Sequence, residues 1–344
     1  MGRFKGNRGL VSGIFVLSLA VLLMGPPISN AESPEEFYKG KTIHWVVSSG
    51  AGGTTDLLSR ICAQALGDKI GAKVKVENMD QNKGVNYAFT NAKPDGLTLA
   101  SKARTALVLN EVAKAPGIKY KSTEFLFITD MLLDAGAVYV RKGSPYGSLE
   151  ALKKAKGLKA GGTSARGFFA TSASVLFEIL GLDGKVIPGY KGPMKLFFAL
   201  GQDEINFIAY QAAAGLKKIK DGTLEPVFVF SRERFSALPE VPTLEELGVK
   251  IPDNLIDAYE LVGKSGQAVM ASPGSPADRV RFLQDMFQEM GKGKKIQDEF
   301  KKTFGVFAPF EHGKAMQSSI GKIMANKELS TQLKGIVDKY TAAR

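Results

Sequence analysis

The sequence predicts an α/β protein in which helices cover parallel sheets, and two observations predict this fold class. Apolar, β-branched segments alternate with segments of helical periodicity along most of the chain. Two glycine-rich turns, residues 48–56 and 162–167, stand where a predicted strand meets a predicted helix. The length of 344 residues predicts about two domains, and a composition of 44% hydrophobic and 23% charged residues is that of a globular protein.

The first 31 residues have the three-part layout of a secretory signal peptide. Three basic residues, Arg3, Lys5 and Arg8, precede the apolar run 10–24, and the small residues up to Ala31 predict cleavage after it. This apolar run is shorter than the ~20 residues of a membrane-spanning helix. The sequence therefore predicts an exported, periplasmic protein. An uncleaved membrane anchor is the alternative.

Strands and helices alternate from residue 42 onward. The predicted strands are 42–48, 73–77, 97–100, 137–141, 205–210, 227–230 and 267–271, and residues 159–162 lead into the second turn. The predicted helices are 55–66, 148–156, 168–180, 212–219, 276–290, 294–304 and 328–343. This alternation predicts parallel sheets with helices on their faces.

Charge and cysteine content exclude several classes of protein. Lys and Arg number 46 against 34 Asp and Glu, a formal net charge of +12, but the basic residues are scattered, which predicts no nucleic-acid partner. The single cysteine, Cys62, excludes an intramolecular disulfide, a zinc ribbon and an iron–sulfur cluster. Two histidines, His44 and His312, are too few for a histidine-rich metal site. No metal and no cofactor are predicted.

The two glycine-rich turns are suited to bind an anion. Glycine lets the backbone approach a ligand closely, and the first N–H groups of the following helix point toward it with the positive end of the helix dipole. Small hydroxyl side chains, among them Ser49, Thr54 and Thr163, add donors and acceptors. The alternative interpretation is a tight connection that only caps a helix. Two such turns in one exported α/β protein favour a ligand.

The same residues do not complete an enzyme motif. Thr55 stands where the dinucleotide fingerprint requires its third glycine. Ala258 stands where a phosphate-binding loop ending at Lys264 and Ser265 requires its first glycine. The turn at residues 162–166 lacks the second glycine of a nucleophile elbow. The sequence therefore predicts a binding protein and no enzyme.

Several short motifs, taken in their order, resemble one family. They are Ala51-Gly52-Gly53-Thr54-Thr55-Asp56, Glu77-Asn78, Pro94-Asp95-Gly96, Gly162-Thr163-Ser164-Ala165-Arg166-Gly167, Pro188-Gly189-Tyr190-Lys191-Gly192, Leu238-Pro239-Glu240-Val241-Pro242-Thr243-Leu244-Glu245 and Ser272-Pro273-Gly274-Ser275-Pro276. With them the chain resembles the extracytoplasmic solute receptors of tripartite tricarboxylate transporters, also called the Bordetella uptake gene type. The resemblance covers most of the chain after residue 31.

The resemblance implies a type II periplasmic-binding-protein fold, in which two α/β lobes close by a hinge on a ligand in the cleft between them. It implies a discontinuous first lobe, residues 32–133 and 255–344, and a second lobe of residues 134–254. The ligand would be a small organic carboxylate, and two integral-membrane transporter subunits would receive the loaded, monomeric receptor. Presentation of the ligand to a membrane sensor is an alternative, and an enzyme is a less favoured one.

The ligand-binding residues expected on this basis lie in the two loops and at four further positions. They are Ser48, Ser49, Gly50, Ala51, Gly52, Gly53, Thr54, Thr55, Asp56, Thr105, Thr163, Ser164, Ala165, Arg166, Gly167, Tyr190, Asn206 and Tyr210. Ser48-Ser49 replaces the family's usual Pro–aromatic pair, which leaves the identity of the acid open. A guanidinium can bind a carboxylate through two parallel hydrogen bonds, so Arg166 is expected to contact ligand. The alternative is that Arg166 points to solvent or pairs with a surface acid.

Overall fold

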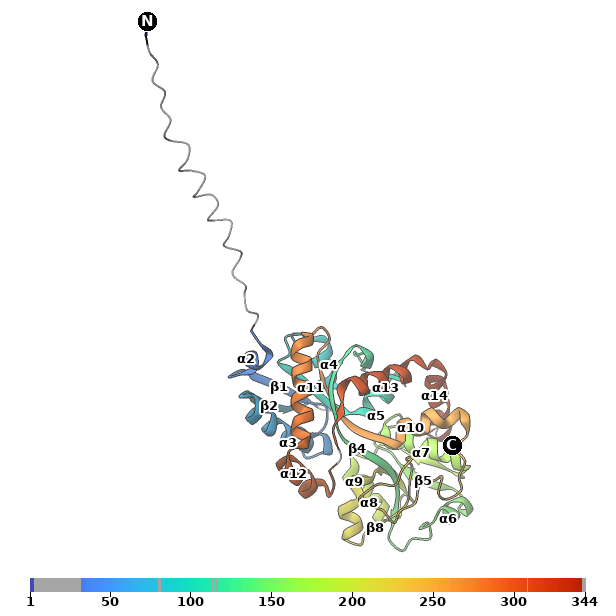
Figure 1. Ribbon diagram of the computed structural model, residues 1–344. Coiled ribbons are helices and arrows are strands. Elements are labelled where there is room, and N and C mark those ends of the chain that lie inside the picture. The colour runs from blue at the N-terminus through green and yellow to red at the C-terminus, as the bar shows by residue number, and fades with distance from the viewer. Residues whose placement is uncertain (3–31, 80–81, 113, 116, 308, 342–344) are drawn as a thin grey trace.

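The computed structural model describes residues 1–2, 32–79, 82–112, 114–115, 117–307 and 309–341. Figure 1 shows two groups of helices and strands, with the long strand β4 (Leu126–Arg141) passing from one to the other. We call the group around β1 (Thr42–Val47) lobe 1 and the group around the second half of β4 lobe 2. The predicted cleavage site after Ala31 lies outside the described residues. Among the described residues, no helix has both the length and the apolar character to cross a membrane.

The sheet of lobe 1 has the strand order β10-β4-β9-β3-β1-β2. Its further strands are β2 (Lys73–Asn78), β3 (Thr98–Ala103), β9 (Lys264–Ala271) and β10 (Glu311–His312). β1 is parallel to β2 and β3, whereas β9 is antiparallel to both β3 and β4. The sheet is therefore mixed: the expectation of parallel strands holds for β1, β2 and β3 and is wrong for β9. β4 carries the chain out of lobe 1 and β9 brings it back alongside, so the two strands run in opposite directions.

Helices pack on both faces of this sheet. The helices with most of their residues in lobe 1 are α2 (Pro34–Tyr38), α3 (Thr54–Ile70), α4 (Lys83–Thr90), α5 (Arg104–Val112), α11 (Ala277–Lys292), α12 (Lys294–Phe304) and α13 (Gly313–Ala325), with a short 3₁₀ helix at Ser122–Glu124. On one face Trp45 packs against Phe287, with ring centroids 5.9 Å apart, and Leu58 is fully buried. On the other face Phe127 shares a core with Leu107.

Lobe 2 is built on the second half of β4. Its other strands are β5 (Leu158–Gly161), β6 (Gly184–Ile187), β7 (Ile208–Gln211) and β8 (Leu224–Val229). β7 and β8 run antiparallel to β4, while β5 and β6 form a parallel pair that a parallel bridge between Ala160 and Phe207 joins to the chain entering β7. Its helices are α6 (Leu149–Lys154), α7 (Phe168–Leu180), α8 (Pro193–Gly201) and α9 (Ala212–Lys220). The helix α10 (Ile256–Gly263), preceded by a 3₁₀ helix at Asp253–Leu255, packs on α7 where the chain returns toward lobe 1.

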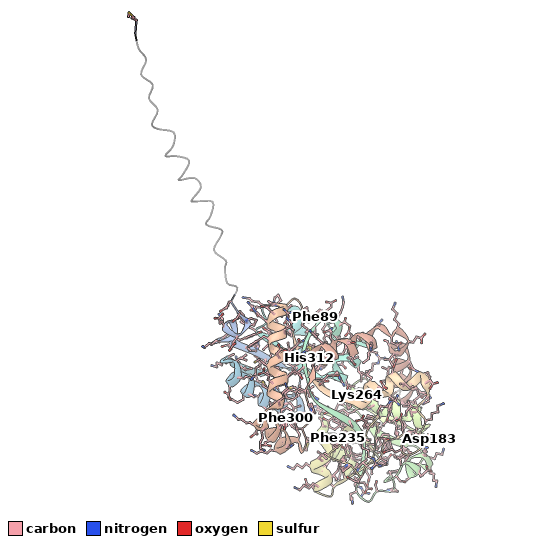
Figure 2. All side chains as sticks on the ribbon, viewed as in Figure 1. Phe89, Asp183, Phe235, Lys264, Phe300 and His312 are labelled. Carbon is pink, nitrogen blue, oxygen red and sulfur yellow. The ribbon has the colours of Figure 1, made fainter. Side chains whose placement is uncertain are left out.

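The last helix, α14 (Lys327–Thr341), packs on α7. Tyr340 stacks on Phe177 with ring centroids 5.1 Å apart, and Lys339 Nζ lies 2.7 Å from a carboxylate oxygen of Glu178. The C-terminal helix thus lies against lobe 2, although α13 before it packs on the lobe 1 half of β4. In Figure 2, Lys264 marks the start of β9, between Phe300 on the side of lobe 1 and Asp183 on the side of lobe 2.

Most of the predicted elements are present in the structure. Two helices, Phe168–Leu180 and Lys294–Phe304, have the bounds that the sequence predicts. The largest difference is β4, which begins at Leu126 instead of Ala137. The lobe boundaries expected from the resemblance stay predictions, and the one at residues 133–134 lies within β4.

Candidate ligand-binding site

The topology places the two glycine-rich loops at sheet edges that face each other. β1, β2 and β3 are parallel, so their carboxyl ends share one edge of lobe 1, and β4 runs in the same direction because β9 lies antiparallel between β3 and β4. In lobe 2, β4 is antiparallel to β7, and Gly136 pairs with Gln211 at the carboxyl end of β7. β4 therefore leaves lobe 1 and enters lobe 2 at their carboxyl edges. Ligands of open α/β sheets bind outside such edges.

Strand pairing sets the distance between the two edges. Met131 of β4 is level with Gln267 of β9, which is level with Ala103 at the end of β3. Gly136 is level with Gln211 at the end of β7. A bulge between Met131 and Asp134 matches three steps of β4 to two of β9, so Gly136 lies about four steps of ~3.3 Å beyond Met131 and the edges lie roughly 13 Å apart along the strand. That span suits a small molecule with loops from both sides.

The first loop, residues 48–53, is organised by one buried carboxylate. Asp56 is 2% exposed, and its oxygens accept hydrogen bonds from the backbone N–H of Gly52 at 2.8 Å and from Asn78 Nδ2 at 2.9 Å. Arg60 Nε lies 2.9 Å from the same carboxylate. Gly52 has φ +76°, a conformation that favours glycine. The Asp56 carboxylate is thus used within the loop and fixes its shape.

Three further hydroxyls that the sequence predicts as ligand contacts are buried and bonded inside the protein. Ser48 Oγ accepts from the backbone N–H of Val85 at 2.7 Å. Thr55 Oγ1 donates to Gln267 Oε1 at 2.5 Å, and Thr105 Oγ1 donates to the backbone carbonyl of Lys264 at 3.1 Å. Thr55 and Thr105 therefore connect the loops of lobe 1 to the returning strand β9.

The remaining surface of the first loop is mostly backbone. Gly50, Ala51 and Gly52 are exposed, and Ser49, Gly53 and Thr54 are half-buried. Gly53 is the N-cap of α3 and has no side chain to accept from the first-turn N–H groups. The positive end of the helix therefore faces the carboxyl edge through backbone alone, an arrangement that suits an anion.

The second loop, residues 162–167, has the same construction. The N–H of Gly162 donates to the carbonyl of Ile187 at 2.9 Å, and the N–H of Tyr190 donates to the carbonyl of Gly162 at 3.2 Å, which holds the loop beside residues 188–192. Ser164 and Ala165 are exposed, and Thr163 and Gly167 are half-buried. Gly167 is the N-cap of α7 and likewise provides no side-chain cap.

Arg166 points toward the C-terminal helix. Its guanidinium lies 2.9 Å from a carboxylate oxygen of Asp338 in α14, and both side chains are partly exposed, at 37% and 46%. The pair joins the second loop to α14. The structure thus shows Arg166 paired with a surface acid, which is the alternative given in the sequence analysis.

Three other predicted residues of lobe 2 have distinct surroundings. The backbone N–H of Asn206 donates to the carbonyl of Lys159 at 2.8 Å, and Asn206 Oδ1 accepts from the backbone N–H of Lys159 at 2.8 Å. Asn206 therefore holds β5 in place. Tyr190 is half-buried, and partial burial together with Glu204 raises the pKa of its hydroxyl. Tyr210 stacks on Phe169, with ring centroids 4.3 Å apart.

The structure also shows two residues outside the predicted set that hold the loops of lobe 1 in place. Asn78 ends β2 and bonds to Asp56 and to the carbonyl of Ser49 at 3.2 Å, so it holds the first loop from the neighbouring strand. Its place at the carboxyl end of a predicted strand is the signal that could have identified it. Gln267 contacts Thr55 from β9, and no local pattern in the sequence marks it.

Other chemistry-bearing residues lie away from this edge or inside the core. Cys62 is buried, and burial raises the pKa of its thiol, as expected for a packed cysteine. His44 Nε2 lies 2.8 Å from Glu77 Oε2 on the sheet of lobe 1. Within the described part of the chain, no group of three or more His, Cys, Asp and Glu is arranged to hold a metal ion.

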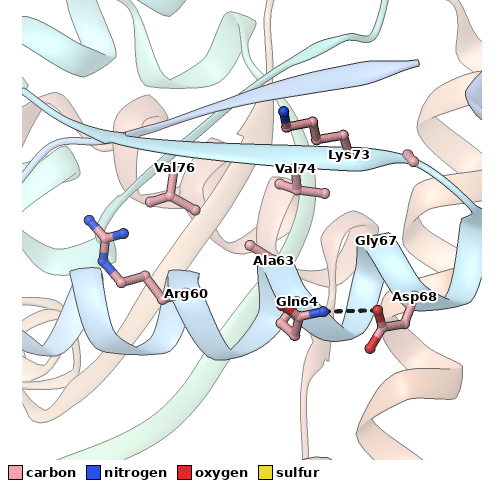
Figure 3. Close-up of a pocket in the computed structure, with 9 residues that line it drawn as sticks. Arg60, Ala63, Gln64, Gly67, Asp68, Lys73, Val74 and Val76 are labelled. Atoms are coloured by element: carbon pink, nitrogen blue, oxygen red, sulfur yellow. Dashed lines mark hydrogen bonds between the residues drawn. The ribbon is translucent and has the colours of Figure 1, made fainter. Parts of the chain in front are cut away.

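Two hollows on the surface contain none of the predicted ligand contacts. One, of about 410 Å³, runs between α3 and the edge strand β2, where Arg60, Gln64 and Val76 are among the lining residues (Figure 3). The other, of about 460 Å³, lies at the start of α14 beside Lys327. The facing carboxyl edges, and not these outer hollows, carry the two glycine-rich loops.

Comparison with known proteins identifies the family. The family model described as the tripartite tricarboxylate transporter family receptor matches residues 58–308. Protein BugT of Bordetella pertussis is 28% identical over 298 residues, which cover 84% of this chain and 86% of BugT. Two solved structures from Rhodopseudomonas palustris share the fold. MatC with bound malate has a TM-score of 0.68 and 18% identity, and covers 86% of this chain and 99% of its own. Rpa4515 with adipate has a TM-score of 0.71 and 20% identity, and the match covers 86% of this chain and 97% of Rpa4515.

The sequence match extends over most of the chain, and the structural matches show the same two-lobed architecture of periplasmic solute-binding proteins. The members of the matched family are solute-binding receptors. The chain belongs to the tripartite tricarboxylate transporter receptor family.

Proposed function

We propose that this protein captures a small organic carboxylate in the periplasm and delivers it to a tripartite tricarboxylate-type transporter. One observation carries the proposal: two uncapped helix N-termini, those of α3 and α7, begin at glycine-rich loops on sheet edges that β4 holds face to face. Backbone N–H groups at a helix N-terminus bind anions, and two such termini can contact one acid from both sides. The malate and adipate bound by two relatives of the same fold support a carboxylate ligand.

The proposal gives each part of the site a role. The exposed backbone of residues 50–52 and 164–165 contacts the acid, and Ser49, Thr54 and Thr163 supply hydroxyls. Asp56, Asn78 and Arg60 keep the first loop in shape. No bond in the ligand is made or broken in this scheme, so the protein acts as a receptor and not as an enzyme.

The partners follow from the family and from the layout of the N-terminus. Two integral-membrane subunits receive the loaded receptor, which works as a monomer with a first lobe of residues 32–133 and 255–344 and a second of 134–254. Cleavage after Ala31 releases the receptor into the periplasm. Mass spectrometry of the periplasmic fraction is expected to show an N-terminus at Glu32. A protein that keeps Met1 and remains in the membrane fraction would contradict export in this form.

Calorimetric titration tests the binding function. Purified protein, unfolded and refolded to remove any acid carried through purification, is titrated with mono-, di- and tricarboxylates. We expect at least one acid to bind with one-to-one stoichiometry. Ser164→Trp places a large side chain on the lobe 2 edge and is expected to weaken binding at least ten-fold. Ser236→Trp, also exposed and in lobe 2 but outside the two loops, is the control. Absence of binding to all three classes, or equal affinity in the Ser164 variant, would refute the proposal.

A further inference from the structure

The carboxyl edge of lobe 2 carries a cluster of aromatic rings. Phe168 and Phe169 form the first turn of α7, directly after the second loop, and Tyr210 stands next to the last residue of β7. Tyr210 stacks on Phe169 at 4.3 Å between ring centroids, and Phe168 lies 6.2 Å from Tyr210. Phe197 of α8 completes the cluster, 6.2 Å from Tyr210.

These rings are only partly buried in the core. Phe169 is 6% exposed and anchors the cluster, whereas Phe168, Tyr210 and Phe197 are half-buried and keep part of their surface outside the packed interior. Tyr190, from the neighbouring loop 188–192, is half-buried in the same core. A partly exposed aromatic surface therefore begins one residue after the glycine N-cap of α7.

The facing edge of lobe 1 has a different character. Residues 48–56 include no aromatic side chain, and Ser48-Ser49 opens the loop with two hydroxyls. The exposed part of this loop is the backbone of Gly50, Ala51 and Gly52. One edge thus offers polar backbone and hydroxyl groups, and the other combines a helix N-terminus with aromatic rings.

We infer that the preferred ligand is an aromatic carboxylate, in which the carboxyl group is attached directly to a flat ring. This inference rests on the proposed function and names the class of acid. The N–H groups of the first turn of α7 hold the carboxylate, and the ring lies against Phe168 and Tyr210. Phe168 is the first residue of α7, so ring and carboxylate must be close together in the ligand. Aromatic pairs gain free energy beyond that of apolar burial, so a flat ring adds to the affinity that the carboxylate provides.

Matched pairs of flat and saturated acids test this inference by calorimetry. Benzoate is compared with cyclohexanecarboxylate, and isophthalate with cis-cyclohexane-1,3-dicarboxylate, because each pair has the same charge and a similar size. We expect the aromatic member of at least one pair to bind about ten-fold more tightly. Equal affinities within both pairs, or tighter binding of the saturated acids, would overturn the inference and leave the carboxylate receptor in place.

Two variants locate the preference on the rings. Tyr210→Leu and Phe168→Leu each keep an apolar side chain and remove one ring, so each is expected to lower the ratio of aromatic to saturated affinity several-fold. Phe198→Leu is the control, because Phe198 lies on the same helix as Phe197 but is 63% exposed. Thermal unfolding of each variant verifies the fold. A ratio unchanged in both folded ring variants would refute the inferred contact.

Failure of the inference and failure of the proposed function give different results. If aliphatic di- or tricarboxylates such as malate bind while the aromatic acids do not, the receptor function stands and the aromatic preference is wrong. If neither aromatic nor aliphatic acids bind, the receptor function itself fails.

Discussion

Arg166 stands at the junction between the second loop and the C-terminal helix, and its role can be separated from that of its partner. The sequence predicts a guanidinium that binds the ligand, whereas the structure pairs it with Asp338 at 2.9 Å. An exposed pair of this kind contributes little to stability, so the guanidinium can exchange one carboxylate for another at small cost. We therefore expect a carboxylate bound at the second loop to replace Asp338 as its partner.

Removal of each member of the pair gives different expectations. Arg166→Ala is expected to weaken binding of the best acid by about ten- to a hundred-fold, the usual effect of losing a charged hydrogen bond. Asp338→Ala is expected to keep the affinity or to strengthen it, because the guanidinium no longer has a competing partner. Calorimetric titration of both variants measures this. If Arg166→Ala binds as tightly as the wild type, the backbone and hydroxyl donors form the whole site.

Asp130 gives the protein a pH-dependent stability. Its carboxyl group is fully buried in β4 beside Arg104, whose Nη1 lies 3.0 Å away and also 2.9 Å from Glu311. Burial raises the pKa of Asp130 to about 7, against the lowering effect of Arg104 and with a further rise from Glu311. The unfolded chain loses this proton near pH 4, and the folded protein keeps it until about pH 7.

The sign of the effect follows from these values. Between about pH 4 and pH 7 the folded state binds the extra proton, so the contribution of Asp130 to stability is greatest below pH 4 and falls by about 1.4 kcal/mol for each pH unit across this range. Asp130→Asn is expected to lack that slope, so the difference in unfolding free energy between wild type and variant should change by about 1.4 kcal/mol for each pH unit in this range. Denaturant unfolding at several pH values measures it. Parallel pH profiles for wild type and variant would show that Asp130 ionises at its ordinary pKa.

At the scale of secondary structure, the sequence predicts elements well where one periodicity is uninterrupted. The helix Phe168–Leu180 is almost entirely buried and ends at Gly181 in a left-handed conformation, which is a strong stop signal. β4 is longer than predicted because its first half, from Leu126, packs between β9 and β10. Those neighbours are more than 120 residues away in sequence, so no local pattern could mark them.

Short helices account for most of the elements that the sequence does not predict. α4 and α8 have 8 and 9 residues, which is near the length at which local periodicity stops being informative. α13 begins at Gly313 and contains Gly321, and glycine lowers the helix signal. The loops at the carboxyl edges are predictable because glycine marks them. The bonds from Gln267 and Asn78 depend on strand register, which emerges only in the folded sheet.

The two glycines of α13 provide a prediction about its packing. A Cβ at Gly313 would lie 1.9 Å from the backbone carbonyl oxygen of Phe127, whereas a Cβ at Gly321 would meet nothing within 4 Å. Gly313→Ala is therefore expected to destabilise the protein by about 1–3 kcal/mol through overpacking against β4. Gly321→Ala, on the same helix, is expected to stabilise it by up to about 1 kcal/mol through helix propensity. Chemical denaturation of the two variants measures both changes in the free energy of unfolding. Equal effects would show that α13 does not pack closely on β4.

At the scale of the whole molecule, two kinds of connection join the lobes. β4 and β9 cross between them as neighbouring strands that pair from Leu126–Ala271 to Ala135–Lys264. The packing of α14 on α7 forms a second connection, because α14 continues from α13 on lobe 1. Movement of the two carboxyl edges toward each other therefore requires the crossing strands to bend while α14 remains on lobe 2.

Closure on the ligand is expected to make the molecule more compact. The edges lie roughly 13 Å apart along β4, and an acid held by both loops gains contacts with both lobes as that distance shortens. Small-angle scattering should therefore show a smaller radius of gyration at saturating concentration of the best acid. Ser164→Trp is expected to reduce or abolish the decrease, because its side chain occupies the space between the edges, and Ser236→Trp should close like the wild type. An unchanged radius in the saturated wild-type protein would mean that the acid contacts one lobe only, or that the lobes already stand at their bound separation.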